Sequence, residues 1–348
     1  MLSEEKPLNQ GSSWIVKSDN DKKMTTSSIF HSYTEQEFIR QAIKLFRFQY
    51  CHNKIYWEYC NRLKIKAEKV EKLEEIPFLP ISFFKTHQVM TTVFKPEIIF
   101  SSSGTTGMIS SKHYVKTLKI YEDSFIKGFD FFYGNPDQYA FLALLPNYLE
   151  REGSSLILMV EKLMNLSCHR HSGFYLYDHQ ALFAKLQELK SVHVKTILFG
   201  VSFALLDFVE AYQLHFPELI VFETGGMKGR RKEMVKEELH QYLKEGFGVA
   251  HIHSEYGMCE LLSQAYSSGN NLFVTPPWMK FLLRDEKDPL SVTTDAKSGV
   301  INVIDFANLY SCSFIATEDL GRRGPDGKIE ILGRLDSAEI RGCNLLIM

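Results

Sequence analysis

Two segments of this chain carry side chains whose types and spacing suit nucleotide chemistry. The first, residues 101–107, reads Ser-Ser-Ser-Gly-Thr-Thr-Gly. Its hydroxyls and backbone N–H groups could converge on phosphate oxygens, since glycine permits close approach and positive φ. The second, residues 253–260, reads His-Ser-Glu-Tyr-Gly-Met-Cys-Glu and offers an aromatic plane for a purine and a carboxylate for a metal ion. Together they predict that ATP is a substrate and that its α-phosphate is the reacting group.

The first segment alone is a weak signal. It is not a Walker A loop, because no Gly-Lys-Ser/Thr follows, and a Ser/Gly/Thr run by itself is also typical of a flexible loop. The apolar residues 98–100 before it predict a strand, and a helix is expected from 114 to 132. A glycine-rich loop between a strand and a helix favours phosphate binding.

Composition limits the class of protein. The 348 residues allow one large domain or two modest ones, and a hydrophobic content of 45% is enough for a sizeable core. A net charge of -2 argues against a non-specific nucleic-acid binder. No apolar run reaches the ~18 residues of a transmembrane helix. The six cysteines form no CxxC pair, which indicates reduced thiols and a cytoplasmic location.

The fold class is predicted from the order of elements. Residues 1–24 are polar and are expected to be a disordered extension. Residues 25–271 alternate strands with helices, which predicts an α/β core with mainly parallel sheets. Residues 272–348 change to short strands and Gly/Asp turns, which predicts a small β-rich part, with a hairpin at Asp326-Gly327.

Individual elements follow from hydrophobic periodicity and caps. Thr34 and Glu37 form a capping box before a helical pattern. Further helices are expected at 154–164, 181–190 and 232–245, with another through Leu205 and Tyr212. Strands are expected at 139–146, 196–200, 219–224, 248–253 and 300–305.

Four motifs, in order, resemble those of the adenylate-forming enzymes, which include acyl-CoA synthetases, firefly-type luciferases and peptide-synthetase adenylation domains. They are the phosphate loop 102–107, the Tyr-Gly-Met-Cys-Glu run 256–260, Thr317-Glu318-Asp319 and Gly-Arg-Leu-Asp at 333–336. Residues 223–230, 253–258 and 339–343 are similar, more narrowly, to the bacterial acyl-protein synthetases of the lux fatty-acid reductase system.

That resemblance implies a role for each matched position. The phosphates of ATP would be bound by Ser102, Ser103, Gly104, Thr105, Thr106 and Gly107. The rest of the nucleotide would be bound by Gly225, Gly226, Tyr256, Gly257, Cys259, Asp319 and Arg334. Tyr256 would stack on the adenine and Asp319 would accept hydrogen bonds from the ribose. Glu260 would hold Mg²⁺, and Cys343 would carry the acyl group as a thioester.

The chain departs from the broad family at several places. Cys259 stands where a threonine is usual, and Glu318 replaces a glycine. The chain ends at Met348, so the small mobile C-terminal domain with its catalytic lysine is expected to be absent. Lys228 is the first candidate to replace that lysine, and Lys85, Arg230 and Arg334 are the others; a solvated surface lysine is the alternative interpretation of Lys228.

The resemblance implies an acid–thiol ligase. ATP would activate a fatty acid as acyl-AMP, and the acyl group would move to Cys343 for delivery to an acyl reductase. Cys259 is a second candidate nucleophile, because it would lie beside the α-phosphate. One alternative is a ligase that transfers the acyl group to coenzyme A or a carrier protein. Another is a non-catalytic nucleotide- or acyl-binding protein.

Overall fold

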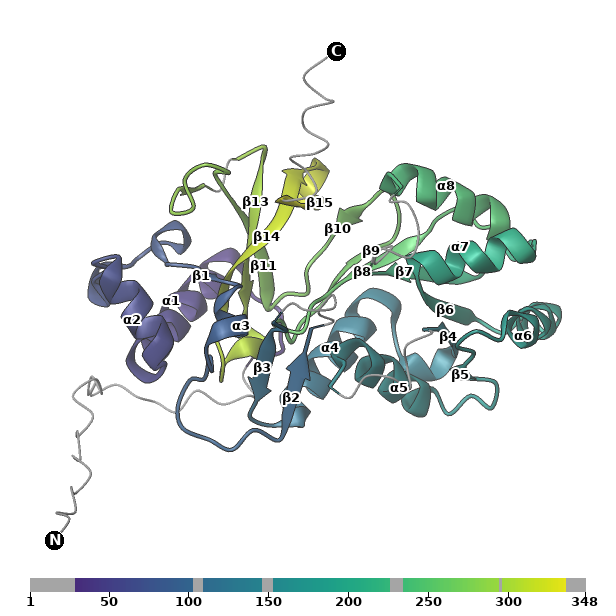
Figure 1. Ribbon diagram of the computed structural model, residues 1–348, viewed down its shortest axis with the longest axis horizontal. Helices are drawn as coiled ribbons and strands as arrows, with labels where there is room; N and C mark the ends of the chain where they lie inside the picture. The colour runs from purple at the N-terminus through teal and green to yellow at the C-terminus, as the bar shows by residue number, and fades with distance from the viewer. Residues whose placement is uncertain (1–28, 103–108, 146–152, 226–233, 294–295, 336–348) are drawn as a thin grey trace, which may run out of the picture.

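A computed structural model describes residues 29–102, 109–145, 153–225, 234–293 and 296–335. Two sheets lie side by side, one flanked by the N-terminal helices and the other by helices from the middle of the chain (Figure 1). A short hairpin and helix α4 lie between them (Figure 1). The α/β architecture with a β-rich C-terminal part is therefore confirmed. None of the described helices has the length and apolarity needed to cross a membrane.

The first sheet has the strand order β5-β4-β6-β7-β8-β9 and is parallel except for the last pair. Its strands are β4 Ala140–Leu144, β5 Gly173–Phe174, β6 Thr196–Val201, β7 Ile220–Thr224, β8 His253–Tyr256 and β9 Ala265–Ser267. Its helices are α5 Ser155–Ser167, α6 His179–Ser191, α7 Ser202–Ala211 and α8 Lys236–Phe247. Every residue of β4 and β6 is buried, as expected for parallel strands covered on both faces.

One strand of this sheet begins later than its sequence pattern predicts. The apolar run from residue 248 predicts a strand, but β8 begins only at His253. Gly248 ends α8 in the left-handed conformation, with φ 65°, and residues 249–252 belong to neither a helix nor a strand. The predicted start at residue 248 was wrong, because Gly248, the first residue of that run, caps α8 and does not begin a strand.

The second sheet has the order β10-β15-β14-β13-β11-β12, and β1 joins it beside β14. Its strands are β1 Leu79–Pro80, β10 Leu272–Phe273, β11 Met279–Arg284, β12 Val292–Thr293, β13 Ser298–Asp305, β14 Phe314–Arg323 and β15 Ile329–Arg334. All pairs are antiparallel apart from β1 with β14. The hairpin predicted at Asp326 and Gly327 is confirmed, with both residues at positive φ between β14 and β15.

The N-terminal helices are α1 Glu35–His52 and α2 Lys54–Arg62, and α1 begins directly after Thr34, where the sequence predicts. Glu37 N donates to Thr34 Oγ1 at 3.3 Å and Thr34 N to Glu37 Oε2 at 2.9 Å, which confirms the capping box. The Gln49 amide donates to Asn308 O and Ser313 Oγ at 3.0 and 3.1 Å. These bonds attach α1 to the loop that joins β13 to β14. Single turns of 3-10 helix lie at Ala67–Lys69, Leu73–Glu75, Pro136–Gln138, Phe306–Asn308 and Pro325–Gly327.

The segment around the serine-rich loop forms a hairpin. Strand β2, Ile98–Ser101, pairs antiparallel with β3, Lys112–Val115, and α3 Phe83–Thr86 precedes them. The helix expected from residue 114 is α4, Leu118–Tyr133, and it begins four residues later. That start was wrong because pairing with β2 holds residues 112–115 in extended conformation. The loop thus leads from one strand into another, and a helix follows the second strand.

Candidate active site

The described site residues come from three groups of strands. Tyr256 ends β8 and Gly225 follows β7, at the carboxyl edge of the parallel sheet. Ser102 follows β2 in the hairpin. Asp319 lies in β14 and Arg334 ends β15, both in the antiparallel sheet. Ligands commonly bind beyond the carboxyl ends of parallel strands, so this is the expected place for a nucleotide site.

Tyr256 and Asp319 are linked across the two sheets. The Tyr256 hydroxyl donates to Asp319 Oδ2 at 2.7 Å, and the ring packs edge-on against Phe281 with centroids 5.5 Å apart. Arg334 is the register partner of Asp319, and its Nε lies 3.7 Å from Oδ1. Burial raises the pKa of Asp319, which the Tyr256 hydroxyl and the Arg334 charge partly oppose. A carboxylate with unfilled lone pairs beside an aromatic ring can accept hydrogen bonds from a pair of hydroxyls.

Cys259 and Glu260 follow Tyr256 closely in the chain, and both are buried. The Cys259 Sγ lies 4.0 Å from the carbonyl oxygen of Ser111, just before β3. Burial and the neighbouring Glu260 carboxylate raise the pKa of the Cys259 thiol well above its usual range. The thiolate is the nucleophile in acyl transfer, so this environment disfavours Cys259 as an acyl acceptor. The Glu260 carboxylate is close enough to Asp319 to raise its pKa.

The backbone from Cys259 to Ser263 is held by three buried side chains that the sequence analysis missed. His113 Nδ1 donates to Cys259 O at 2.9 Å, and Asn308 Nδ2 donates to Glu260 O at 2.8 Å. Asp305 accepts from Leu262 N at 3.0 Å and from the N and Oγ of Ser263 at 2.9 and 2.6 Å. No local pattern marks these residues, because their partners lie more than forty positions away in the chain.

Two further carboxyl groups lie near the carboxyl ends of β7 and β8. Glu223 is buried, and its pKa falls to about 2, because Lys236 at 3.4 Å, the His240 ring at 3.7 Å and a hydrogen bond from Ser202 outweigh the opposing effect of burial. Glu255 accepts from Thr224 Oγ1 at 2.9 Å, and loss of hydration raises its pKa to about 7. Ser202 begins α7 and Lys236 begins α8, so the contacts of Glu223 with these two residues attach both helices to the sheet. Ser202 Oγ also donates to Gly225 O at 3.2 Å, where Gly225 adopts a φ of 77°.

Many of the predicted site residues lie outside the described residues. They are Ser103, Gly104, Thr105, Thr106, Gly107, Gly226, Lys228, Arg230 and Cys343. Lys85, by contrast, is exposed on α3. Within the described ranges no group of three or more His, Cys, Asp or Glu side chains could hold a metal ion. Mg²⁺ in nucleotide sites is commonly held by one or two carboxylates together with phosphate oxygens, so the single Glu260 fits that kind of site.

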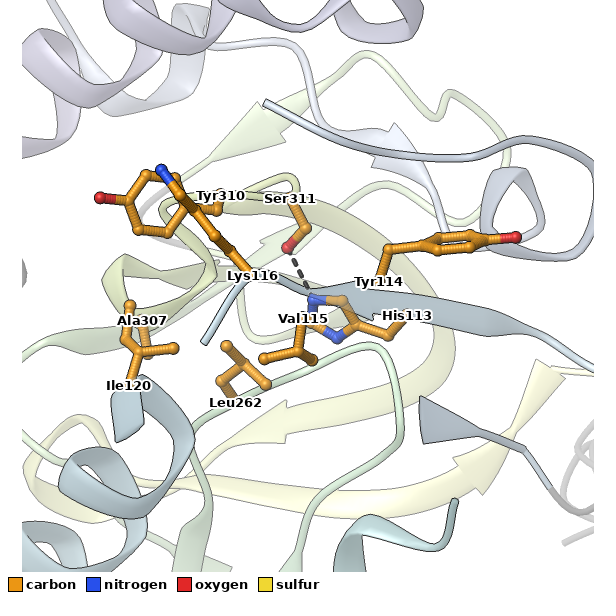
Figure 2. A pocket seen from close by; sticks show the side chains of 9 residues that line it. All are labelled: His113, Tyr114, Val115, Lys116, Ile120, Leu262, Ala307, Tyr310 and Ser311. Carbon is orange, nitrogen blue, oxygen red and sulfur yellow. Dashed lines mark hydrogen bonds between the residues drawn. The ribbon is translucent and has the colours of Figure 1, made fainter. Parts of the chain in front are cut away.

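A small pocket opens beside His113 on the side of α4 (Figure 2). Its lining is mostly apolar, from Val115, Ile120, Leu262 and Ala307. Lys116 Nζ lies 4.0 Å from the centre of the Tyr310 ring, a cation–π contact. Figure 2 also shows the hydrogen bond between the His113 ring and the Ser311 hydroxyl.

Comparison with solved structures shows that this chain has the fold of adenylate-forming enzymes. The 2-hydroxyisobutyryl-CoA ligase, in the postadenylation state in complex with R3-HIB-AMP, superposes with a TM-score of 0.64 at 10% identity, over 94% of this chain and 75% of that chain. ATP-bound MatB from Rhodopseudomonas palustris superposes with a TM-score of 0.52 at 17% identity, over 70% of this chain and 50% of that chain. The match thus spans about half the length of MatB.

Comparison of sequences points to a narrower group of proteins than the comparison of structures does. The family model "Acyl-protein synthetase, LuxE" matches residues 10–121. The long-chain-fatty-acid–luciferin-component ligase of Vibrio harveyi is 23% identical over 324 residues, which cover 86% of this chain and 84% of that protein. The resemblance to the acyl-protein synthetases, within the adenylate-forming enzymes, is therefore confirmed. The prediction of an enzyme of the ligase class is confirmed with it.

Proposed function

We propose that this protein activates a fatty acid with ATP as acyl-AMP and then transfers the acyl group to the thiol of Cys343. The observation that carries the proposal is that Tyr256, Asp319 and Glu260 lie together and that Cys259 contacts Ser102 after β2, since these are the positions matched to nucleotide and metal binding. The similarity to the Vibrio harveyi ligase supports a fatty acid as the substrate. The ATP-bound neighbours support ATP as the co-substrate.

In the first half-reaction a carboxylate oxygen of the fatty acid attacks the α-phosphorus, and the bond from that phosphorus to the pyrophosphate oxygen breaks. Tyr256 would stack on the adenine, Asp319 would accept from the ribose hydroxyls, and residues 102–107 would bind the phosphates. Negative charge grows on the phosphates in the transition state, so nearby cations and N–H donors stabilise it. Mg²⁺ held by Glu260 would supply part of that positive charge, and Lys228 and Arg334 are the proposed protein cations.

In the second half-reaction the Cys343 thiolate attacks the acyl carbonyl, and AMP leaves with the electron pair of the broken C–O bond. The thiol proton passes to solvent or base as the thiolate forms. The buried Cys259, with its raised thiol pKa, is a poor competitor for this step. The thioester would then pass to an acyl reductase, and we propose that this occurs in the cytoplasm.

The test is incubation with radiolabelled myristate, ATP and Mg²⁺, followed by detection of acyl-AMP and of hydroxylamine-sensitive label on the protein. We expect Cys343→Ala to form acyl-AMP and to remain unlabelled, while Cys168→Ala, a change at an exposed cysteine, is labelled like the wild type. Label that survives in Cys343→Ala and disappears in Cys259→Ala would reject the assignment of Cys343.

The same assay separates the alternative functions. Label that appears on coenzyme A or a carrier protein, with none on this chain, would favour a ligase with an external acceptor. Absence of acyl-AMP under every condition would favour a non-catalytic nucleotide- or acyl-binding protein.

A further inference from the structure

We propose that His113 is a positioning residue, which fixes the Cys259–Glu260 segment against the hairpin that bears the phosphate loop. The inference rests on the proposed function, because it concerns the placement of the Glu260 carboxylate. His113 lies in β3 and is almost completely buried. None of the predicted site motifs includes this residue.

The ring of His113 makes a hydrogen bond at each nitrogen. A carbonyl oxygen can only accept, so Nδ1 carries the proton and donates to Cys259 O at 2.9 Å. In the neutral ring Nε2 is then an acceptor, and Ser311 Oγ donates to it at 2.8 Å (Figure 2). Burial lowers the pKa of His113 to about 4, so the ring stays neutral at physiological pH. The two hydrogen bonds therefore fix one tautomer and one orientation of the His113 ring.

Each segment that the ring contacts is itself anchored. On the hairpin, Ser111 N donates to Ser102 Oγ at 2.9 Å and Ser102 N donates to Ser111 O at 3.2 Å, so the base of the phosphate loop is closed two residues from His113. On the other side, Ser311 O accepts from Asn53 Nδ2 at 2.9 Å and from the Thr91 hydroxyl. His113 therefore joins the loop base, the motif segment and the N-terminal helices.

The placement of Glu260 depends on these bonds. Cys259 O belongs to the peptide group that leads directly into Glu260, and the next carbonyl, Glu260 O, accepts from Asn308 Nδ2 at 2.8 Å. With both carbonyls held, the Glu260 side chain leaves the backbone in one direction relative to Ser102 and Ser111 at the base of the loop. A displacement of about 1 Å in an active site can lower the rate ~100-fold, so loss of the His113 bond should be visible in catalysis.

The test compares two amide substitutions at His113. In His113→Asn the amide nitrogen lies about where Nδ1 lies, so it can still donate to Cys259 O. In His113→Gln the amide lies near the position of Nε2 and can replace only the bond to Ser311. The readout is fatty-acid-dependent ATP–pyrophosphate exchange at varied Mg²⁺ concentration.

We expect His113→Gln to lower the maximal exchange rate roughly 10- to 100-fold and to raise the Mg²⁺ concentration for half-maximal rate, with the KM for fatty acid unchanged. His113→Asn should recover most of both losses. Ser311→Ala removes the second bond together with a longer contact of the same hydroxyl to Asn308 O, at 3.4 Å. It should show the same shift to a smaller degree and serves if His113→Gln folds poorly. Ser167→Ala is the control, because it deletes a buried bond to Tyr139 O (2.7 Å) at the amino end of β4, away from the carboxyl edge of the sheet where the site lies. Its Mg²⁺ dependence should match the wild type.

Equal losses in the Asn and Gln variants, or a shift in Mg²⁺ dependence for Ser167→Ala as large as for His113→Gln, would overturn the positioning role. Normal exchange in both His113→Gln and Ser311→Ala would overturn it as well. Wild-type protein without any exchange would instead reject the proposed function, and this inference with it.

Discussion

Asp305→Asn should destabilise the protein strongly, although it is nearly isosteric. Asp305 is fully buried and each of its oxygens accepts two hydrogen bonds. Oδ2 accepts from Leu262 N and Ser263 N at 3.0 and 2.9 Å. Oδ1 accepts from Ser263 Oγ and Ala307 N at 2.6 and 3.0 Å. An asparagine has only one oxygen, so its NH₂ group must face two of these donors.

The size of the loss follows from which donors can adapt. If the asparagine oxygen takes the place of Oδ2, its NH₂ group takes the place of Oδ1. The Ser263 hydroxyl can then rotate and accept a hydrogen bond from the NH₂ group, but Ala307 N, which can only donate, faces another donor. If the asparagine oxygen takes the place of Oδ1, the NH₂ group takes the place of Oδ2. Leu262 N can still donate to Asn308 Oδ1 at 3.1 Å, but Ser263 N faces the NH₂ group and has no acceptor. Either way one buried N–H loses its acceptor, which costs about 1–3 kcal/mol, and the remaining bonds lose their charge assistance. We expect the free energy of unfolding to fall by ~2–4 kcal/mol.

The assay is urea denaturation followed by tryptophan fluorescence, since Trp278 Nε1 donates to Ser263 Oγ at 3.1 Å and reports on this cluster. Asp285→Asn is the matched control. Asp285 is exposed, and a single oxygen, Oδ1, accepts both of its bonds, from Lys287 N and Asp288 N. An asparagine keeps both, so the change should cost less than about 0.5 kcal/mol. Equal losses for the two variants would refute the hydrogen-bond argument.

Two other predictions concern stability. Glu223 has a pKa of about 2 in the folded protein against 4.5 in the unfolded chain, so its interaction with Lys236 stabilises above pH 4.5 and is lost as pH falls toward 2. The unfolding free energies of wild type and Glu223→Gln should therefore converge by about 3 kcal/mol over that range, and a pH-independent difference would contradict this. Gly248→Ala should lower the melting temperature more than Gly327→Ala. Both glycines have positive φ, but only at Gly248 would a Cβ meet another residue, 2.7 Å from His215 Cα; equal shifts would argue against the clash.

Much of the fold follows from local sequence because its causes are local. The capping box at Thr34 depends on residues three positions apart, and the turn at Asp326 and Gly327 on two adjacent residues that tolerate positive φ. The apolar runs of β4 and β6 mark strands buried on both faces. Local preference failed where another interaction competes: pairing with β2 holds residues 112–115 as a strand, and the cap at Gly248 delays β8.

The sequence by itself therefore determined the order of the motifs and the chemical groups that they carry. Only the tertiary structure decided which groups meet. The Tyr256 hydroxyl bonds to a carboxylate 63 residues away, and the His113 ring bonds to positions 146 and 198 residues away. Such contacts leave no periodic trace, because each depends on how whole strands pack and not on the residues beside it. The burial that raises the pKa of the Cys259 thiol is likewise a property of the packed site and not of its motif.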